Sequence, residues 1–338
     1  DYVRATRKEV LDFAKADLEF ASKWLPGTVT KDKEGRIVKA AADHLLSEVY
    51  ISLEQYDNAI EAASRVIDSG LYKLMTERFG SQKTKAGDVY SDLFRTGNYN
   101  RSSGNLESIW AYQIEDYTTG GGNNQWIRNW APFLVHVKTP DGKAQVVTDS
   151  MGRGTGRVRP SRYLYYTIWK DYWTDMRNSS FNWRRVFYYN NPASTEYFGK
   201  VIEPKTTYED TCRSIYPYTR KVEGKPWGGS NTSGRTDNDL YVYRLAETYL
   251  LRAEAYLRKG DAVNAAQDIN VVRARAKATN VDPANVTIDY ILDERARELV
   301  AEEPRRRTLI RMGKLVERVR LYGFRPTGRT SIQDYHAL

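Results

Sequence analysis

The sequence predicts a mainly α-helical protein, in which a scaffold of repeated helical hairpins is interrupted by a large irregular insertion with a few short strands. Two observations favour this fold class. Residues 241–276 read as two helices joined by a tight turn, and residues 41–70 repeat the same pattern at the same spacing. Because a single hairpin cannot bury both of its faces, we expect the two hairpins to stack on each other.

The chain begins with an expected helix over residues 1–25. Its apolar residues recur at helical spacing and form one stripe, made of Val10, Phe13, Ala14, Leu18 and Ala21. Pro26 and Gly27 end this helix, and a polar loop over residues 28–35 leads to the first hairpin.

At three equivalent positions, the two hairpins carry the same residue: a tyrosine, an alanine and a valine. Tyr50, Ala59 and Val66 correspond to Tyr256, Ala265 and Val272. We expect Asp57 to cap the second helix of this hairpin and Gly70 to end it.

Residues 71–239 lose the regular pattern and form the insertion. Glycine-rich runs predict loops or turns at residues 120–124, 151–157 and 227–234. Short apolar or alternating runs predict strands at residues 108–114, 133–137 and 186–189, and a helix is expected over residues 161–173. So long an irregular stretch inside a compact protein is usually functional.

The second hairpin carries the clearest helix signals. One face of its first helix is lined by Leu245, Tyr249, Ala253, Tyr256 and Leu257, and one face of its second by Ala262, Ala265, Ile269 and Val272. Gly260 is expected to end the first helix and Asp261 to cap the second. This pattern is typical of a tetratricopeptide-type hairpin.

After the second hairpin, Thr287 is expected to cap a helix that starts at Ile288. Pro304 interrupts that helix, and a further helix is expected over residues 309–319. Residues 322–338 show no clear pattern.

Composition excludes some classes of protein. No apolar run is long enough to span a bilayer. The net charge of +9 permits an anionic partner without selecting one. The basic residues between 305 and 320 alternate with apolar ones, which indicates a packed helix, and no base-stacking motif accompanies them. We therefore expect no nucleic-acid partner. The only cysteine, Cys212, excludes an intrachain disulfide.

The sequence shows no set of catalytic residues. Glu294, Glu298 and Glu302 share a helix face, but arginines at 295, 297 and 305 are interleaved with them, which predicts structural ion pairs. The three histidines, His44, His136 and His336, are scattered, and no cluster has metal-ligand spacing. We expect no enzyme activity, no metal and no cofactor.

Aromatic and polar residues of the insertion loops are the candidates for ligand binding. A flat indole can stack on the apolar face of a sugar ring, while amide and guanidinium groups bond its hydroxyls; the same surface could anchor a protein interface. The candidate residues are Asn123, Trp126, Trp130, Arg153 and Trp227. In contrast, Trp169 and Trp173 lie at helical spacing and are expected in the core.

Several motifs resemble those of the SusD/RagB family. They are the run at residues 244–256, the Ala-Gln-Asp-Ile-Asn-Val-Val-Arg-Ala-Arg-Ala run at 266–276, and the Ile-Leu-Asp-Glu-Arg-Ala-Arg-Glu-Leu run at 291–299 with its continuation to residue 315. Residues 35–41 and 107–110 also fit the family pattern, whereas Glu303 and Thr308 depart from it.

The resemblance implies a single SusD-like domain, with N-terminal repeat helices over residues 1–70, a ligand-facing insertion over 71–239 and C-terminal repeat helices over 240–338. It implies a non-catalytic protein of the Bacteroidetes outer membrane, exposed at the cell surface, which binds glycan and delivers it to a SusC-like TonB-dependent transporter. Family members carry an N-terminal lipid anchor that is absent from this sequence, so we expect an N-terminally truncated fragment.

Two other functions stay open at this point. The chain could be a tetratricopeptide-type scaffold that binds only protein, or an endo-acting glycosidase with a carboxylate pair facing the aromatic loops. The positive charge also raises an anionic glycan as a possible ligand.

Overall fold

The computed structural model describes residues 3–115, 117–149, 151–203 and 210–323. The chain forms two compact units. We call them the repeat unit (Asp1–Ser81, Asn98–Tyr112 and Tyr241–Glu302) and the loop unit (Gln82–Gly97, Gln113–Leu240 and Glu303–Leu338). Most regular structure is helical, which confirms the predicted fold class. The predicted organisation as one domain stays a prediction. His336 and the patternless residues 324–338 lie outside the described residues.

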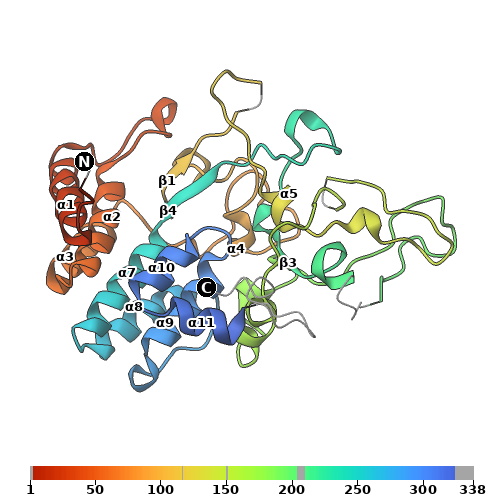
Figure 1. Ribbon diagram of the computed structural model, residues 1–338. Helices are drawn as coiled ribbons and strands as arrows, with labels where there is room; N and C mark the ends of the chain where they lie inside the picture. The colour runs from red at the N-terminus through yellow and green to blue at the C-terminus, as the bar shows by residue number, and fades with distance from the viewer. Residues whose placement is uncertain (1–2, 116, 150, 204–209, 324–338) are drawn as a thin grey trace. The chain divides into compact units, whose positions relative to one another are not determined.

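The repeat unit contains the long helices and the longer strands (Figure 1). Its helices are α1 (Arg7–Trp24), α2 (Lys39–Ser52), α3 (Tyr56–Ile67), α7 (Leu245–Arg258), α8 (Ala262–Arg275) and α9 (Ile288–Leu299). Its two strands, β1 (Ser108–Tyr112) and β4 (Leu240–Arg244), pair with each other. The strand predicted at 108–114 is thereby confirmed, but residues 241–244, predicted as the start of a helix, belong to β4. Helix α7 starts only at Leu245 because the chain at Arg244 is still extended.

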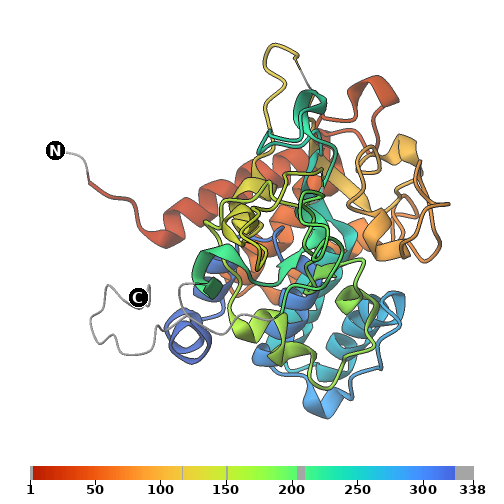
Figure 2. The ribbon, with the colours of Figure 1, turned by 90° about the vertical axis from the view of Figure 1, so that its right-hand side faces the viewer.

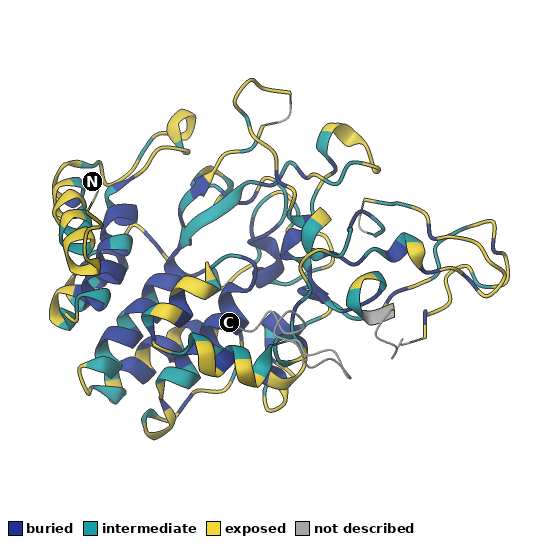
Figure 3. Cartoon of the chain, in the orientation of Figure 1, coloured by how far each residue is buried: buried dark blue, intermediate teal, exposed yellow. Residues whose placement is uncertain are grey.

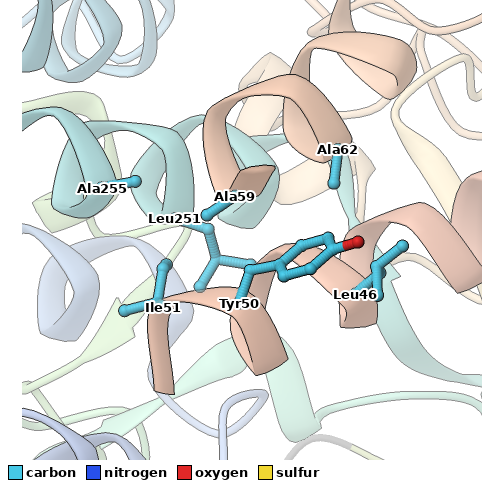
Figure 4. Close-up of a cluster of buried hydrophobic side chains, with 7 residues drawn as sticks. All are labelled: Leu46, Tyr50, Ile51, Ala59, Ala62, Leu251 and Ala255. Carbon is cyan, nitrogen blue, oxygen red and sulfur yellow. The ribbon is translucent and has the colours of Figure 1, made fainter. Parts of the chain in front are cut away.

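The two predicted hairpins, α2–α3 and α7–α8, stack on each other through α7. Figure 4 shows the shared core, in which side chains of α2, α3 and α7 meet. Its buried members are Leu46, Tyr50, Ile51, Ala59, Ala62, Leu251 and Ala255. The alanines have no exposed surface, and side chains this small let helix backbones approach closely. The prediction of stacked hairpins is confirmed.

The turns of the two hairpins differ. In the second, Gly260 adopts a left-handed φ of 92° and the Asp261 side chain accepts a hydrogen bond from the backbone nitrogen of Asn264, as predicted. In the first, Glu54 takes the left-handed conformation and Gln55 is the N-cap residue. The prediction that Asp57 caps this helix is therefore wrong.

Asp57 lies two residues inside the helix and forms an ion pair with Lys259 instead. The end of the same hairpin also differs from the prediction, because α3 ends at Ile67, three residues before Gly70.

Helix α1 buries only part of the predicted stripe, since Ala14, Leu18 and Ala21 are half-buried. Leu18 packs against the core shared by α2, α3 and α7, and the buried Ser22 hydroxyl donates to Asp43 of α2 at 2.6 Å. Val10 and Phe13 point outward and are 56% and 71% exposed, in the face of α1 that is yellow in Figure 3. Their placement in a buried stripe is wrong because the packed face is shifted around the helix.

The glutamates and arginines of α9 form the structural ion pairs that the sequence predicts. Glu294 accepts from Arg273 at 2.9 Å and from Arg297 at 2.9 Å. Glu298 is paired with Arg275 and with Arg244, the latter at 3.0 Å. Glu107 of β1 completes the network through the same two arginines. Burial alone would lower the pKa of Arg244, but the surrounding glutamates raise it well above its usual value.

The loop unit consists mainly of short helices, turns and loops. Its helices are α4 (Val89–Asp92), α5 (Trp126–Trp130), α6 (Arg162–Tyr165), α10 (Arg305–Arg311) and α11 (Leu315–Tyr322), and its strands β2 (Trp183–Arg184) and β3 (Tyr218–Thr219) pair antiparallel. Single 3₁₀ turns include Leu134–His136, Thr167–Trp169, Arg220–Val222 and Trp227–Gly229.

Several predictions for this unit are wrong. The strand predicted at 133–137 is a 3₁₀ turn, and that at 186–189 contributes only a single bridge between Tyr188 and Val201. The helix predicted over 161–173 breaks after Tyr165. The helix predicted over 309–319 is split at Gly313, whose φ of 71° ends α10.

Of the two tryptophans predicted in the core, only one lies there. Trp169 is fully buried, which confirms the prediction. Trp173 is 56% exposed and stacks under the guanidinium of Arg185 at 5.2 Å. Trp173 lies outside the core because the helix predicted to place it on the same face as Trp169 ends at Tyr165.

Among the described residues, none of the helices combines the length and the apolar character that crossing a bilayer requires.

Candidate functional site

Three segments of the loop unit meet at Thr236, which is fully buried. Its backbone nitrogen donates to the carbonyl of Asn124 at 2.8 Å, and on its other side it forms a bridge with Pro226. The backbone nitrogen of Trp227 donates to the carbonyl of Arg235 at 3.2 Å. This junction holds the loop before Trp126 and the turn that carries Trp227 on either side of one extended segment.

Asn124 orients the start of α5 at this junction. Its side chain is buried, accepts from the backbone nitrogen of Trp126 at 2.9 Å and donates to the carbonyl of Asn238 at 3.1 Å. The neighbouring Asn123, predicted to bind ligand, is exposed, and its side-chain oxygen accepts from Gln125 at 2.9 Å. Asn124 thus positions the loop, while Asn123 faces solvent.

Arg153 links the same loops through hydrogen bonds to their backbone. It is 4% exposed, and its guanidinium donates to the backbone carbonyls of Asp149, Gly224, Ser233 and Arg235, the first three at 2.9 to 3.0 Å. Burial lowers the pKa of Arg153, and the charges of Asp149 and Asp237 oppose that shift. Because four carbonyls engage the guanidinium, we leave Arg153 out of the set of ligand-contacting residues that we propose.

An aromatic pair of one exposed and one half-buried ring lies beside the junction. The rings of Tyr117 and Trp227 are 6.4 Å apart and tilted by 52°, and Tyr117 is 83% exposed. The loops that carry them rise near the top of both Figure 1 and Figure 2. Gly228 has a φ of 59°, and a Cβ atom there would lie 2.3 Å from the Tyr117 hydroxyl. The turn therefore requires glycine where the tyrosine closes over it.

Helix α5 extends this surface. Trp126 and Trp130 are half-buried and lie one helical turn apart. Trp126 adjoins the junction through Asn124, and the exposed Arg128 packs against Gly234 of the loop that follows Trp227.

Trp130 lies at the other end of α5. Its carbonyl accepts from the Tyr216 hydroxyl at 3.2 Å, and residues 155–158 run alongside the helix. The structure therefore brings Trp126 and Trp227 to one junction and places Trp130 a turn further along.

We call Tyr117, Trp126 and Trp227, with Asn123 and Arg128, the aromatic surface. Tyr117 and Arg128 were not among the predicted site residues. A signal for Tyr117 was present, because it is an aromatic residue three positions before the Gly120–Gly122 run. Nothing in the sequence links it to Trp227.

The arrangement suits binding. The exposed ring of Tyr117 and the half-buried indoles offer apolar faces, and the nearby amide and guanidinium offer hydrogen bonds to hydroxyl groups. Two acidic side chains of the segment after Thr236 are engaged, since Asp239 accepts from the backbone nitrogen of Ile114 at 2.8 Å and Asp237 lies 3.5 Å from Lys225. Among the described residues, no group of histidine, cysteine and acidic side chains is arranged to hold a metal ion.

Comparison with known proteins gives consistent relatives. Over 98% of its length this chain is 24% identical to SusD-like protein P25 of Formosa agariphila, of which it covers 61%. Over 102 residues, 30% of this chain and 18% of the relative, it is 38% identical to the starch-binding protein SusD of Bacteroides thetaiotaomicron. The chain thus spans less than two thirds of the length of these curated relatives.

Solved structures share the fold. Surface glycan-binding protein A from Bacteroides thetaiotaomicron, solved in complex with laminarihexaose, has a TM-score of 0.68 at 22% identity, covering 94% of this chain and 65% of that chain. A laminarin-binding SusD-like protein has a TM-score of 0.60 at 21% identity, covering 96% and 66%. Residues 80–337 match the SusD family, and since this match extends over most of the sequence, the chain belongs to the SusD family, as its motifs predicted.

Proposed function

We propose that this chain binds a glycan at the cell surface without catalysis and delivers it to a SusC-like TonB-dependent transporter of the outer membrane. The observation that carries the proposal is the pair formed by the exposed Tyr117 and the half-buried Trp227, next to Trp126 at the junction at Thr236. The family membership supports it, as do the relatives whose names give starch, laminarin or laminarihexaose as ligand.

The tilt between the two rings favours a chain-like ligand. Rings inclined by 52° form two facets, which can contact successive units of a polymer that turns along its length. Arg128 and Asn123 lie at the edge of these facets, where sugar hydroxyls would be. Interactions of this kind hold a glycan without changing its bonds, so we infer binding and no hydrolysis.

The cell-surface location and the transporter rest on family membership. A lipid anchor at the N-terminus of the full-length protein would hold the chain at the outer membrane. The transporter would then receive the glycan that the aromatic surface has captured.

The test is affinity gel electrophoresis against a panel of neutral and acidic polysaccharides. Wild type is compared with Trp227→Ala, Trp126→Ala and Tyr117→Ala. Trp24→Ala is the matched control, since Trp24 is 66% exposed on α1, outside the loop unit. An aromatic residue at the centre of a binding surface contributes about 2 kcal/mol, which weakens binding roughly 30-fold when it is lost.

We expect retardation of wild type and Trp24→Ala by at least one polysaccharide, and its loss in Trp227→Ala. Incubation with the retarding polysaccharide should release no shorter products. Equal retardation of wild type and Trp227→Ala would remove the aromatic surface from the binding site, and retardation by none of the polymers would contradict glycan capture itself.

A further inference from the structure

A pocket of about 430 Å³ lies within the loop unit, beside the turn that leads to Trp227. It has the size of a small-molecule site. Part of its wall is apolar and is formed by Phe94, Phe181 and Pro226. Pro226 also forms the bridge with Thr236, so one residue belongs both to the pocket wall and to the junction beneath the aromatic surface.

The polar part of the wall is strongly basic. Five cationic side chains line the pocket, namely Lys85, Arg95, Arg220, Lys221 and Lys225, against two acidic ones, Asp149 and Glu223. An excess of one charge inside a concave surface concentrates ions of the opposite sign there.

The charge of Glu223 is already balanced. Its carboxylate lies 2.8 Å from a nitrogen of Arg184 and 2.9 Å from Nε of Arg220, and it accepts from the Tyr218 hydroxyl at 2.7 Å. Two guanidinium groups therefore share this carboxylate. Asp237 lies 3.5 Å from Lys225, and with this carboxylate counted the five cationic side chains still outnumber three acidic ones.

Lys221 differs from a solvated surface lysine. It is only 8% exposed, and its ammonium lies 4.5 Å from the ring centre of Phe94 and 5.0 Å from that of Tyr90. Aromatic faces stabilise a cation that has lost part of its water. A charge held in such surroundings is screened less than one in open solvent and attracts an anion more strongly.

We propose that this basic pocket receives an acidic group of the glycan, either a carboxylate or a sulfate ester carried on a sugar ring. The proposal rests on the glycan binding proposed above and specifies its ligand class. The ring of the acidic sugar would pack on the Phe181 side of the wall, with its anionic group toward the cations. Because Lys225 and Pro226 line the pocket and Trp227 follows directly, a bound chain would continue onto the aromatic surface.

Two pairs of polymers test the proposal, each with one sugar backbone and with or without the anionic group: polygalacturonate with its methyl ester, and dextran sulfate with dextran. The pocket variant is Arg95→Gln/Lys225→Gln. It leaves the fold in place because the Lys225 side chain is 66% exposed and Arg95 makes one long hydrogen bond, to the carbonyl of Ala86 at 3.3 Å. The control Lys31→Gln/Lys33→Gln removes the same charge from exposed residues of the repeat unit.

We expect wild type and control to bind at least one acidic polymer more tightly than its neutral counterpart. Each lost charged hydrogen bond costs roughly tenfold in affinity, so the pocket variant should bind that polymer at least about tenfold more weakly. Lys221→Met, which keeps the packing of the stem, should also weaken it. The polymer pair that responds distinguishes carboxylate from sulfate.

Other outcomes overturn the inference. Equal losses in the pocket variant and the control would show that net charge alone attracts the polymer. Binding of neutral polysaccharides alone, unchanged in the pocket variant and lost in Trp227→Ala, would leave glycan capture intact and refute the acidic pocket. Binding of no polymer at all would refute both.

Discussion

The buried ion-pair network of the repeat unit allows a quantitative prediction for Arg244→Met. Arg244 is 1% exposed and bonds three glutamates: Glu107, Glu298 at 3.0 Å, and Glu302 through two nitrogens at 2.6 and 2.9 Å. Methionine fills a similar volume and removes the charge. Glu107 and Glu298 keep their ion pairs with Arg275, whereas Glu302 loses a bidentate partner.

The expected loss of stability follows from the Glu302 carboxylate, which keeps its charge when Arg244 is replaced. Removing one partner from a buried ion pair costs about 3–5 kcal/mol, because the remaining charge is left without compensation. We therefore expect Arg244→Met to lower the free energy of unfolding by about that amount. Lys259→Met is the control, since it breaks an ion pair whose two side chains are 51% and 75% exposed and should cost less than about 1 kcal/mol.

Urea denaturation followed by far-ultraviolet circular dichroism measures both free energies by linear extrapolation. A second variant, Arg244→Met/Glu302→Gln, tests the cause. If the cost comes from the stranded carboxylate, neutralising Glu302 should restore part of the stability, giving a favourable coupling energy. A cost for Arg244→Met as small as that for Lys259→Met would refute the reasoning, and so would a double variant that is less stable than the sum of the two single changes.

Two further predictions concern tyrosine hydroxyls. Burial and the hydrogen bond to Glu19 raise the pKa of Tyr50 to about 12, whereas the unfolded side chain ionises near pH 10. The stability that neutral Tyr50 provides is thus fully present below pH 10 and is lost between pH 10 and 12. Tyr50→Phe should be less stable than wild type by about 1 kcal/mol at pH 8. This difference in the free energy of unfolding, measured by urea denaturation, should shrink above pH 10. A difference that stays constant up to pH 12 would contradict the raised pKa of Tyr50. Gly228→Ala should displace the Tyr117 side chain and weaken glycan retardation in affinity electrophoresis, and Gly229→Ala, where a Cβ meets nothing within 4 Å, is its control. Equal retardation of these two variants would contradict a role for Tyr117.

The repeat unit could be predicted from the sequence because its signals are local. Helical periodicity placed α7 and α8, and the pair Gly260 and Asp261 marked the turn between them. The cap of α3 was predicted wrongly because residues just before Asp57 have that role. Glu54 takes the left-handed conformation in the turn, and Gln55 is the N-cap residue. Val10 and Phe13 of α1 were wrongly predicted as buried because periodicity identifies apolar residues, and which of them become buried depends on the partner helix.

The candidate site could be predicted only in part, since long-range contacts build it. Tyr117 meets Trp227 from 110 positions away, and Arg153 reaches carbonyls near 224 and 235. Glycine-rich loops and tryptophans predict the region of the candidate site, but no spacing rule connects these segments. A buried arginine bonded to backbone carbonyls has no sequence signature, so Arg153 could not be distinguished from an arginine that faces a ligand.

Arg153 also bears on how the proposed site would reach useful affinity. Its guanidinium holds four backbone carbonyls, and the junction at Thr236 ties the segments on either side, so the segments next to Trp126 and Trp227 are bonded together without a ligand. Binding to a surface ordered in advance loses less conformational entropy. Stacking on Tyr117 and Trp227 would hold many sugars, because most sugar rings have an apolar face. Discrimination between sugars requires a group that binds one ligand more tightly or repels another. On our proposals the basic pocket beside Trp227 supplies that group, and the same turn that orders the rings places an acidic sugar against the lysines.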